Sequence, residues 1–172
     1  KYELSKENFN TLEKIKVLFK IDRDENQYTF IKGKKAYLIL RELDNFYMQI
    51  ALEEACLAEK NGDIPCGAII VLDDRIIAKA HNQIELLNDP TAHAEILAIT
   101  QAANTIKNWR LYDCIMYVTK EPCVMCSGAI VSARIKKVVW SMSDSKRGGM
   151  SKFNILSNNN LNHKVLVESG LL

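Results

Sequence analysis

Apolar residues in the first 44 positions follow two different spacings. Between residues 6 and 20 they recur at steps of three and four, which predicts a short amphipathic helix. Two apolar runs, Tyr28–Ile31 and Ala36–Leu40, then flank the polar segment Lys32–Lys35, and this order predicts a β-hairpin. We treat residues 1–44 as an N-terminal extension, because its pattern indicates structure but no chemistry.

From residue 45 onward the pattern alternates between strands and helices. In chain order it predicts a helix from Asp44 to the Asn61-Gly62 pair, strands over Cys66–Leu72 and Arg75–Ala80, a loop from His81 to Asp89, a helix from Pro90 to Asn104, a strand over Ile115–Thr119, a helix from Pro122 to Ala133, and strands over Lys137–Met142 and Val165–Glu168. Proline is well tolerated in the first turn of a helix, which favours the two starts at Pro90 and Pro122. This order is typical of a layered sheet and predicts one α/β domain over residues 45–172.

Size and composition are those of a globular protein. The 172 residues are 48% hydrophobic and 26% charged, and the most apolar run, Ile64–Leu72, is too short to cross a bilayer. Five cysteines, an odd number, and the lack of a recognisable secretory segment argue against a disulfide framework. We therefore expect a protein of the reducing cytoplasm with no membrane partner.

The charge balance is close to neutral, but the distribution of charge is uneven. A formal net charge of +2 does not by itself indicate nucleic acid, because phosphate binding needs clustered charge. Basic residues gather after the last two cysteines, at Lys136, Lys137, Lys146, Arg147 and Lys152. The pattern leaves open whether this segment binds phosphates or forms an ordinary solvated surface.

Two closely spaced cysteines and one histidine form a candidate metal site. Cys123 and Cys126 lie at a predicted helix start, where exposed N–H groups favour the thiolate that binds metal. Alone, such a pair fits a redox site or half of a zinc ribbon, and no second pair completes a four-cysteine site. His93, near the start of the preceding predicted helix, supplies a third ligand. Three protein ligands leave the fourth tetrahedral position open, as in catalytic zinc sites, so we expect about one Zn²⁺ per chain.

Glu95 lies two residues beyond His93 and is the candidate proton carrier. A carboxylate beside a metal site, not ligating the metal, supplies the general acid and base that hydrolysis needs. A single histidine is more often a packed residue, and a single glutamate more often a surface residue. The conjunction of His-x-Glu with Pro-Cys-x-x-Cys, each at a predicted helix start, favours a catalytic zinc site.

These two motifs resemble the signature of the cytidine deaminase superfamily. More narrowly, residues 45–170 resemble the bacterial tRNA-specific adenosine deaminases. The matching stretches are Ile64–Ala68, His81-Asn82, Asp89–Glu95, Glu121–Ile130, Asp144–Gly148 and Leu161–His163. The resemblance implies a three-layer α/β/α fold around a mixed five-stranded sheet. It also implies hydrolysis of adenosine to inosine at the wobble position of an arginine tRNA, with Glu95 moving the protons.

The resemblance also assigns substrate contacts and partners. Asn82 matches the asparagine that contacts the target nucleoside. Ala94 lies in the same motif as His93 and is also assigned to substrate binding. Asp144, Lys146 and Arg147 match the loop that lines the anticodon pocket. The expected partners are the anticodon loop of a tRNA and a second copy of the chain in a homodimer, with no DNA. The sequence ends before the family's C-terminal helix, so we expect a domain that lacks this helix.

Two other functions stay open on the sequence. The zinc motif is shared with guanine and cytosine deaminases, which act on a free base. A non-catalytic zinc-containing subunit that only helps to bind RNA would also keep the three ligands. The basic residues around Lys146 favour RNA over a free base, which has no phosphates, and Glu95 counts against a silent subunit.

Overall fold

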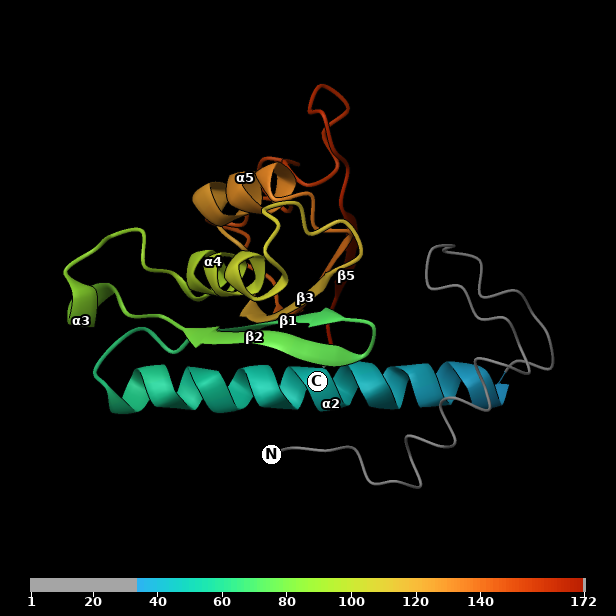
Figure 1. Ribbon diagram of the computed structural model, residues 1–172, viewed down its shortest axis with the longest axis horizontal. Helices are drawn as coiled ribbons and strands as arrows, with labels where there is room; N and C mark the ends of the chain where they lie inside the picture. The colour runs from blue at the N-terminus through green and yellow to red at the C-terminus, as the bar shows by residue number, and fades with distance from the viewer. Residues whose placement is uncertain (1–33, 172) are drawn as a thin grey trace. The chain divides into compact units, whose positions relative to one another are not determined.

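The computed structural model describes the backbone of residues 34–171 and the side chains of residues 41–171. Contacts divide the chain into two compact units, residues 1–44 and 45–172, and the described part of the first unit is the beginning of helix α2. In chain order the described elements are α2 (Lys34–Lys60), β1 (Gly67–Leu72), β2 (Arg75–His81), α3 (Ile84–Leu87), α4 (Ala94–Ile106), β3 (Ile115–Lys120), α5 (Val124–Ser132), β4 (Lys137–Met142) and β5 (Leu166–Ser169) (Figure 1). No helix among them is both long enough and apolar enough to span a membrane.

The strands of the second unit form one mixed sheet of five strands in the order β2-β1-β3-β4-β5. Strand β1 is antiparallel to both of its neighbours, β2 and β3, whereas β3, β4 and β5 run parallel. Asp73 and Asp74 join β1 to β2, and their φ angles of 47° and 59° fit a tight two-residue hairpin turn. The mixed five-stranded sheet implied by the resemblance is therefore confirmed.

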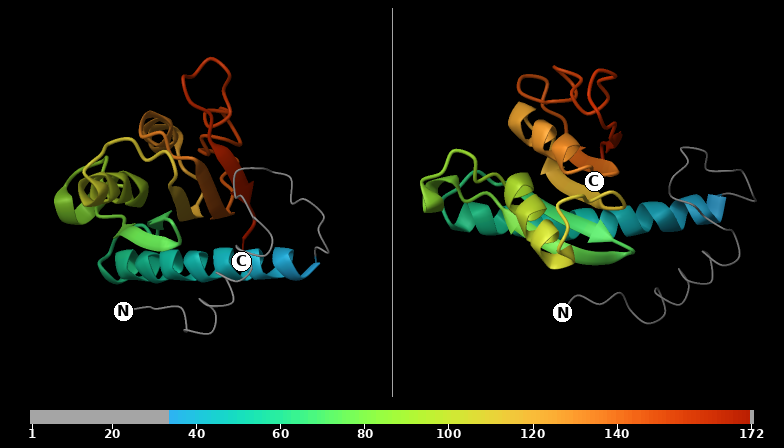
Figure 2. Two further views of the ribbon diagram at one scale, coloured as in Figure 1. Left: turned by 45° about the vertical axis from the view of Figure 1, so that its right-hand side comes forward. Right: turned by 45° about the horizontal axis from the view of Figure 1, so that its top comes forward.

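Helices cover both faces of this sheet, as the views in Figures 1 and 2 show. Side chains of a strand alternate between the two faces. On one face, Ile70, Val118 and Trp140 belong to a single buried cluster. Ala98 of α4 and Ile130 of α5 belong to the same cluster, so these two helices cover this face.

The opposite face of the sheet packs against α2. The ring centroid of Tyr117 in β3 lies 5.1 Å from that of Tyr47 in α2. Gly67 at the start of β1 has no room for a side chain, because an added Cβ would lie 2.0 Å from the Ala51 carbonyl oxygen. The backbone of α2 therefore lies directly on β1, and the three-layer α/β/α arrangement is confirmed.

Helix α2 begins earlier than the pattern of the sequence predicts. The run Ala36–Leu40 is helical, so the predicted hairpin is wrong. Between Lys34 and Asn61 the chain contains neither glycine nor proline, and nothing in this stretch interrupts a helix. Short apolar runs fit either periodicity, which is why the run was open to both interpretations. The predicted helix over residues 6–20 and the strand Tyr28–Ile31 lie outside the described residues.

Helix α4 begins at Ala94, so its predicted start at Pro90 is wrong by about one turn. Pro90 is the second residue of a turn in which the Ala92 N–H donates to the Asp89 carbonyl oxygen over 3.1 Å. The Asp89 side chain closes the same turn, since its Oδ1 accepts the Thr91 N–H at 2.8 Å and the Thr91 hydroxyl at 2.7 Å. The loop predicted before this turn also contains the short helix α3.

Candidate active site

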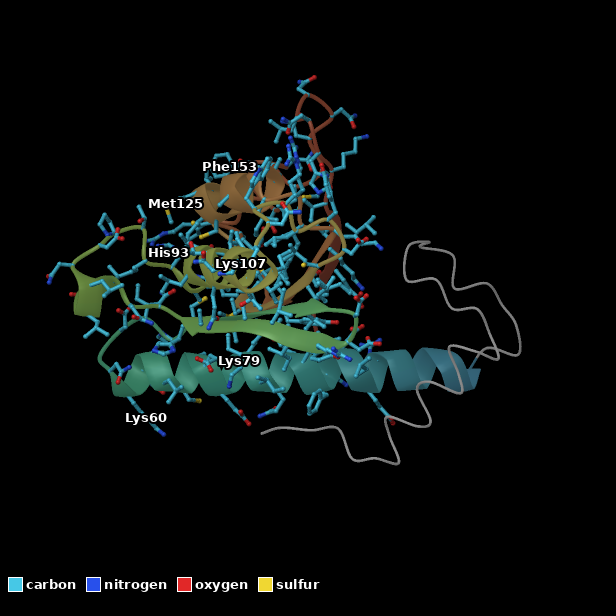
Figure 3. The ribbon with its side chains drawn as sticks, viewed as in Figure 1. Lys60, Lys79, His93, Lys107, Met125 and Phe153 are labelled. Carbon is cyan, nitrogen blue, oxygen red and sulfur yellow. The ribbon has the colours of Figure 1, made fainter. Side chains whose placement is uncertain are left out.

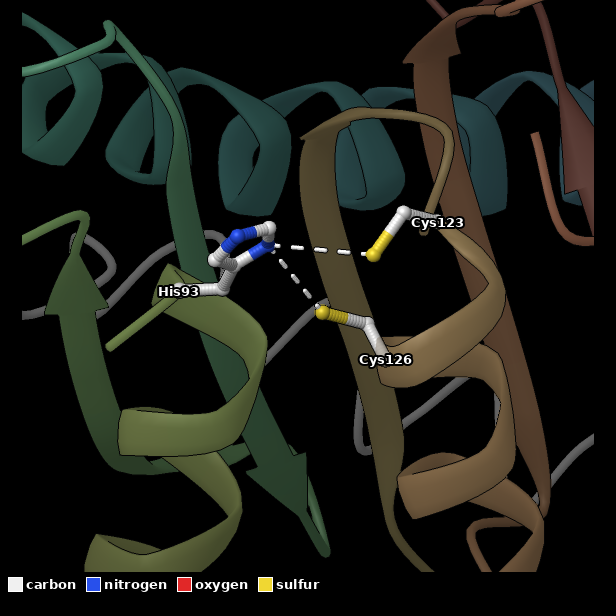
Figure 4. Close-up of side chains that lie close together, drawn as sticks. All are labelled: His93, Cys123 and Cys126. Carbon is white, nitrogen blue, oxygen red and sulfur yellow. Dashed lines mark hydrogen bonds between the residues drawn. The ribbon is translucent and has the colours of Figure 1, made fainter. Parts of the chain in front are cut away.

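The starts of α4 and α5 bring the three predicted metal ligands together (Figure 4). His93 is the N-cap of α4, and Cys123 is the N-cap of α5, with Cys126 in the first turn of that helix. Neither N-cap side chain bonds to the backbone of its own helix, as a capping side chain would. Both are therefore free to turn toward a common point. Figure 3 labels His93 at the start of α4 and Met125 in the first turn of α5.

The two nitrogen–sulfur separations match those of a tetrahedral zinc site. His93 Nδ1 lies 3.4 Å from Cys126 Sγ and 3.8 Å from Cys123 Sγ, and the three atoms lie within 4.8 Å of one another. A tetrahedral zinc with bonds of about 2.0 Å to nitrogen and about 2.3 Å to sulfur separates such donors by about 3.6 Å. The residues present therefore fit a metal ion held by one imidazole nitrogen and two sulfurs.

The two thiols differ in their tendency to ionise. Hydrogen bonding with Cys126, helped by His93, lowers the pKa of the Cys123 thiol to about 3. Pairing with Cys123, together with burial, raises the pKa of the Cys126 thiol. The pKa of His93 is also raised, chiefly by its hydrogen bond with Cys123. The cluster alone thus stabilises one thiolate rather than two, whereas a bound divalent cation would stabilise both.

Glu95 brings an unpaired carboxyl oxygen to the same helix start. It lies in the first turn of α4 and is 3% exposed, and its Oε2 has no hydrogen-bond partner among the residues that the structure describes. Burial raises the pKa of this carboxyl, because desolvation disfavours the charged form. A buried polar atom without a partner costs free energy unless something else binds it. This oxygen is therefore a candidate to bind a group that is not part of the chain.

Asn82 and Ala94, both predicted to bind substrate, are joined to each other by a hydrogen bond. Asn82 follows β2 and is buried, and its Oδ1 accepts the Ala94 N–H at 2.8 Å. The asparagine thus caps the start of α4 in place of the N-cap residue His93, whose side chain turns to the cysteines. This bond occupies the Asn82 Oδ1 and the Ala94 N–H, and it does not involve the Asn82 amide Nδ2.

The three predicted RNA contacts lie in the segment after β4. The Asp144 Oδ1 accepts the backbone N–H groups of Lys146 and Arg147 at 2.9 Å each, and its Oδ2 pairs with Lys120 Nζ at 2.8 Å. The Lys120 ammonium and these N–H groups lower the pKa of Asp144 to about 2. Asp144 therefore shapes the turn from within, whereas the side chains of Lys146 and Arg147 are exposed.

Glu121 is absent from the predicted site residues but organises this same segment. It is buried and its carboxylate accepts four hydrogen bonds from the residues after β4. The one local sign of this packing is the Gly148-Gly149 pair, since adjacent glycines permit a close backbone approach. Gly148 forms an isolated antiparallel bridge with Cys123, which brings the segment against a candidate metal ligand.

Comparisons with known proteins show which family the chain resembles. The family model of the MafB19-like deaminases matches residues 43–170. A tRNA-specific adenosine deaminase of Aquifex aeolicus is 51% identical over 121 residues, which cover 70% of this chain and 80% of that protein. A solved structure from studies of A-to-I editing by tRNA:A34 deaminases at the wobble position of transfer RNA has a TM-score of 0.71 and 41% identity, and the match covers 73% of this chain and 92% of that one.

A guanine deaminase of Bacillus subtilis is also similar, over a smaller part of the chain. Its TM-score is 0.56 and its identity 42%, and the match covers 57% of this chain and 63% of that one. The family model spans most of the chain and includes His93, Glu95 and both cysteines of the candidate metal site. The chain therefore belongs to the MafB19-like deaminase family and groups with the tRNA-specific adenosine deaminases.

Proposed function

We propose that this protein is a zinc-dependent hydrolase that converts adenosine to inosine at the wobble position of a tRNA. The observation that carries the proposal is the orphaned Glu95 oxygen beside a cluster of one histidine and two cysteines. A deaminase needs both features, a metal site and a proton carrier that does not ligate the metal. The names of the similar proteins supply the substrate, since both the curated relative and the wobble-editing structure concern tRNA adenosine.

The reaction adds water to C6 of adenine and expels ammonia, so protons move from the water to the ring and to the amine. Zinc held by His93, Cys123 and Cys126 would supply a water whose pKa is lowered to about 7. Glu95 would accept a proton through its Oε2 and deliver it to N1 of the purine as the water oxygen bonds to C6. The same carboxylate then carries the second proton to the amine at C6, which leaves as ammonia. Glu95 ends the cycle ionised, and the other product is inosine.

A single-stranded anticodon loop suits this site. Its bases are already unpaired, so placing one of them at the metal costs less than extracting a base from a duplex. The Asn82 Nδ2 is available to donate a hydrogen bond to the target nucleoside. Lys146 and Arg147 are exposed and supply positive charge for phosphates of the loop. Binding of RNA is therefore expected to weaken as salt rises, whereas binding of an uncharged base is not.

The zinc-loaded protein is expected to form inosine at the wobble position of an arginine anticodon stem-loop and to leave free adenosine, guanine and cytosine almost unchanged. Nuclease digestion followed by mass spectrometry measures the inosine, and ammonia release measures the reaction with each free compound. A stem-loop with guanosine at the wobble position is the matched control. If the protein released ammonia from guanine and formed no inosine in the RNA, it would instead be a guanine deaminase, like the similar Bacillus subtilis protein. Bound zinc with neither product would indicate a non-catalytic subunit.

We also propose that the protein is a homodimer. Large apolar side chains are exposed on and before α3, namely Ile64 at 60%, Leu86 at 63% and Leu87 at 50%. Exposed apolar side chains that gather in one region are typical of surfaces that another protein covers. Sedimentation equilibrium at micromolar concentration is expected to give twice the chain mass of 19.5 kDa. A single chain mass under these conditions would contradict the proposal.

The proposed setting is the cytoplasm, where tRNA is found, and the proposed catalytic part is residues 45–172. Two observations support this division: the contact units separate at Asp44, and the family match covers residues 43–170. We regard residues 1–44 as an N-terminal extension. Inosine formation by cell fractions tests the location. The activity of a chain without residues 1–33, which leaves α2 whole, tests whether that part of the extension is needed.

A further inference from the structure

The segment Asp144–Ser151, called the basic loop below, folds back onto the residues that precede α5. The Gly149 N–H donates to the Pro122 carbonyl oxygen at 2.8 Å, and Gly148 pairs with Cys123 in an isolated antiparallel bridge. The basic loop therefore contacts a metal ligand and the residue before it. Whatever fixes the conformation of the basic loop also fixes where its cations lie relative to the site.

One carboxylate, that of Glu121, ties together both ends of the basic loop. Its Oε2 accepts the Asp144 N–H at 2.8 Å and the Ser151 hydroxyl at 2.6 Å. Its Oε1 accepts the Ser151 N–H at 2.6 Å and the Met150 N–H at 3.2 Å. Glu121 is 4% exposed, so water does not compete freely for these bonds. Both carboxylate oxygens of Glu121 are therefore hydrogen-bonded to the basic loop.

Asp144, the first residue of the basic loop, links Glu121 to the backbone of the two exposed cations, Lys146 and Arg147. Asp144, whose N–H donates to Glu121, accepts through Oδ1 the N–H groups of Lys146 and Arg147 at 2.9 Å each. The Asp144 Oδ2 pairs at 2.8 Å with Lys120, the residue before Glu121. The backbone at Lys146 and Arg147 is thus linked to Glu121 through a single residue.

Two glycines show how closely the basic loop packs against its surroundings. A Cβ at Gly148 would lie 2.3 Å from Glu121 Oε1, far inside contact distance. A Cβ at Gly149 would lie 2.1 Å from the hydroxyl oxygen of Ser127, a fully buried residue of α5. The position of the loop is therefore set both by the Glu121 carboxylate and by the body of α5.

We infer that Glu121 is a positioning residue for substrate binding, which holds the basic loop against the start of α5 and presents Lys146 and Arg147 to the RNA. This inference rests on the proposed function, because the free bases and nucleosides that are the alternative substrates have no phosphates for these cations. The side-chain hydrogen bonds of Glu121 all go to the basic loop. Its loss is therefore expected to weaken RNA binding more than it slows the chemical step.

The substitution Glu121→Gln tests this role in the zinc-loaded full chain. Glutamine keeps the shape of the side chain, but each orientation of its amide turns an NH₂ group toward at least one backbone N–H of the basic loop. We expect the Kd for the anticodon stem-loop and the KM to rise about tenfold, with kcat changed by less than about twofold. Log affinity falls with log salt, and the magnitude of this slope is expected to decrease by about 0.7 for each phosphate that the displaced cations no longer neutralise. Zinc content is expected to stay unchanged.

Three further variants make the test specific. Glu53→Gln, at an exposed position of α2, makes the same charge change away from the loop and is expected to alter none of these quantities. Asp144→Asn combined with Glu121→Gln completes a double-mutant cycle, and the two effects are expected to be less than additive because both act through the basic loop. Gly148→Ala keeps the Glu121 carboxylate but displaces the loop, so it is expected to reproduce the weaker binding. If Glu121→Gln does not fold, the RNA affinity of Gly148→Ala tests whether the position of the basic loop controls binding.

Two outcomes would overturn the inference: an unchanged affinity and salt slope in Glu121→Gln, or a loss confined to kcat or zinc content. The unaltered chain separates this inference from the proposed function. If the unaltered chain forms no inosine, the proposed function is wrong. If it is active and Glu121→Gln and Gly148→Ala bind RNA as well as it does, only the positioning role is wrong.

Discussion

Replacing Glu95 by glutamine is expected to lower kcat for inosine formation by about 10²–10⁴-fold while zinc stays bound at about one ion per chain. Glutamine keeps the length and shape of the side chain, but it cannot take a proton from water and pass it on. Glu95 is buried, and its Oε2 has no hydrogen-bond partner among the described residues. This oxygen is therefore available to a reactant, and the loss of its proton transfer should appear in kcat.

Stability is expected to separate the loss of chemistry from a loss of structure. The Glu95 carboxyl has a raised pKa because burial disfavours its charged form. A neutral amide removes the cost of burying the charged carboxylate at neutral pH. In the absence of metal, the variant is therefore expected to have a Tm equal to or above that of the metal-free unaltered chain. Glu53→Gln, at an exposed position of α2, is the control and is expected to keep full activity. Full activity in Glu95→Gln would reject Glu95 as the proton carrier.

The grouping of the three candidate metal ligands, with Glu95 on the same helix start as His93, could be predicted from the sequence because it depends on short spacings near helix starts. Cys123 and Cys126 lie at the N-cap and in the first turn of α5, and His93 and Glu95 occupy the same places on α4. Residues this close together stay near one helix end even if its first residue is misjudged. The wrong start at Pro90 therefore moved the predicted helix by about one turn without separating the ligands.

Contacts between distant segments could not be predicted in this way. The Asn82 side chain reaches a backbone N–H 12 residues later, and Glu121 reaches donors 23 to 30 residues later. Periodicity reports local structure, whereas these bonds depend on where the sheet places the ends of its strands. Asn82 and Asp144, which were predicted as substrate contacts, consequently use acceptor oxygens within the protein. The exposed side chains of Lys146 and Arg147 remain available to RNA.

Replacing Cys126 by serine is expected to abolish zinc binding and, with it, the deaminase activity. Cys126 is fully buried in the first turn of α5, and its Sγ lies 3.4 Å from His93 Nδ1. Zinc binds the thiolate form of cysteine, at about 2.3 Å, and a serine hydroxyl stays protonated at neutral pH. The substitution leaves two protein ligands, and metal analysis by mass spectrometry is expected to find far less than one zinc per chain.

Zinc is also expected to stabilise the unaltered chain and to have almost no such effect on Cys126→Ser. A ligand that binds only the folded state stabilises it by about 2.7 kcal/mol at 100 times its Kd, which for a domain of this size raises Tm by about 5–11 °C. Cys56→Ser, at an exposed cysteine of α2, is the matched control and is expected to keep both the zinc and the rise in Tm. If Cys126→Ser keeps its zinc and the same rise in Tm, then Cys126 is not a ligand. The three-ligand geometry on which the deaminase proposal depends would then be wrong.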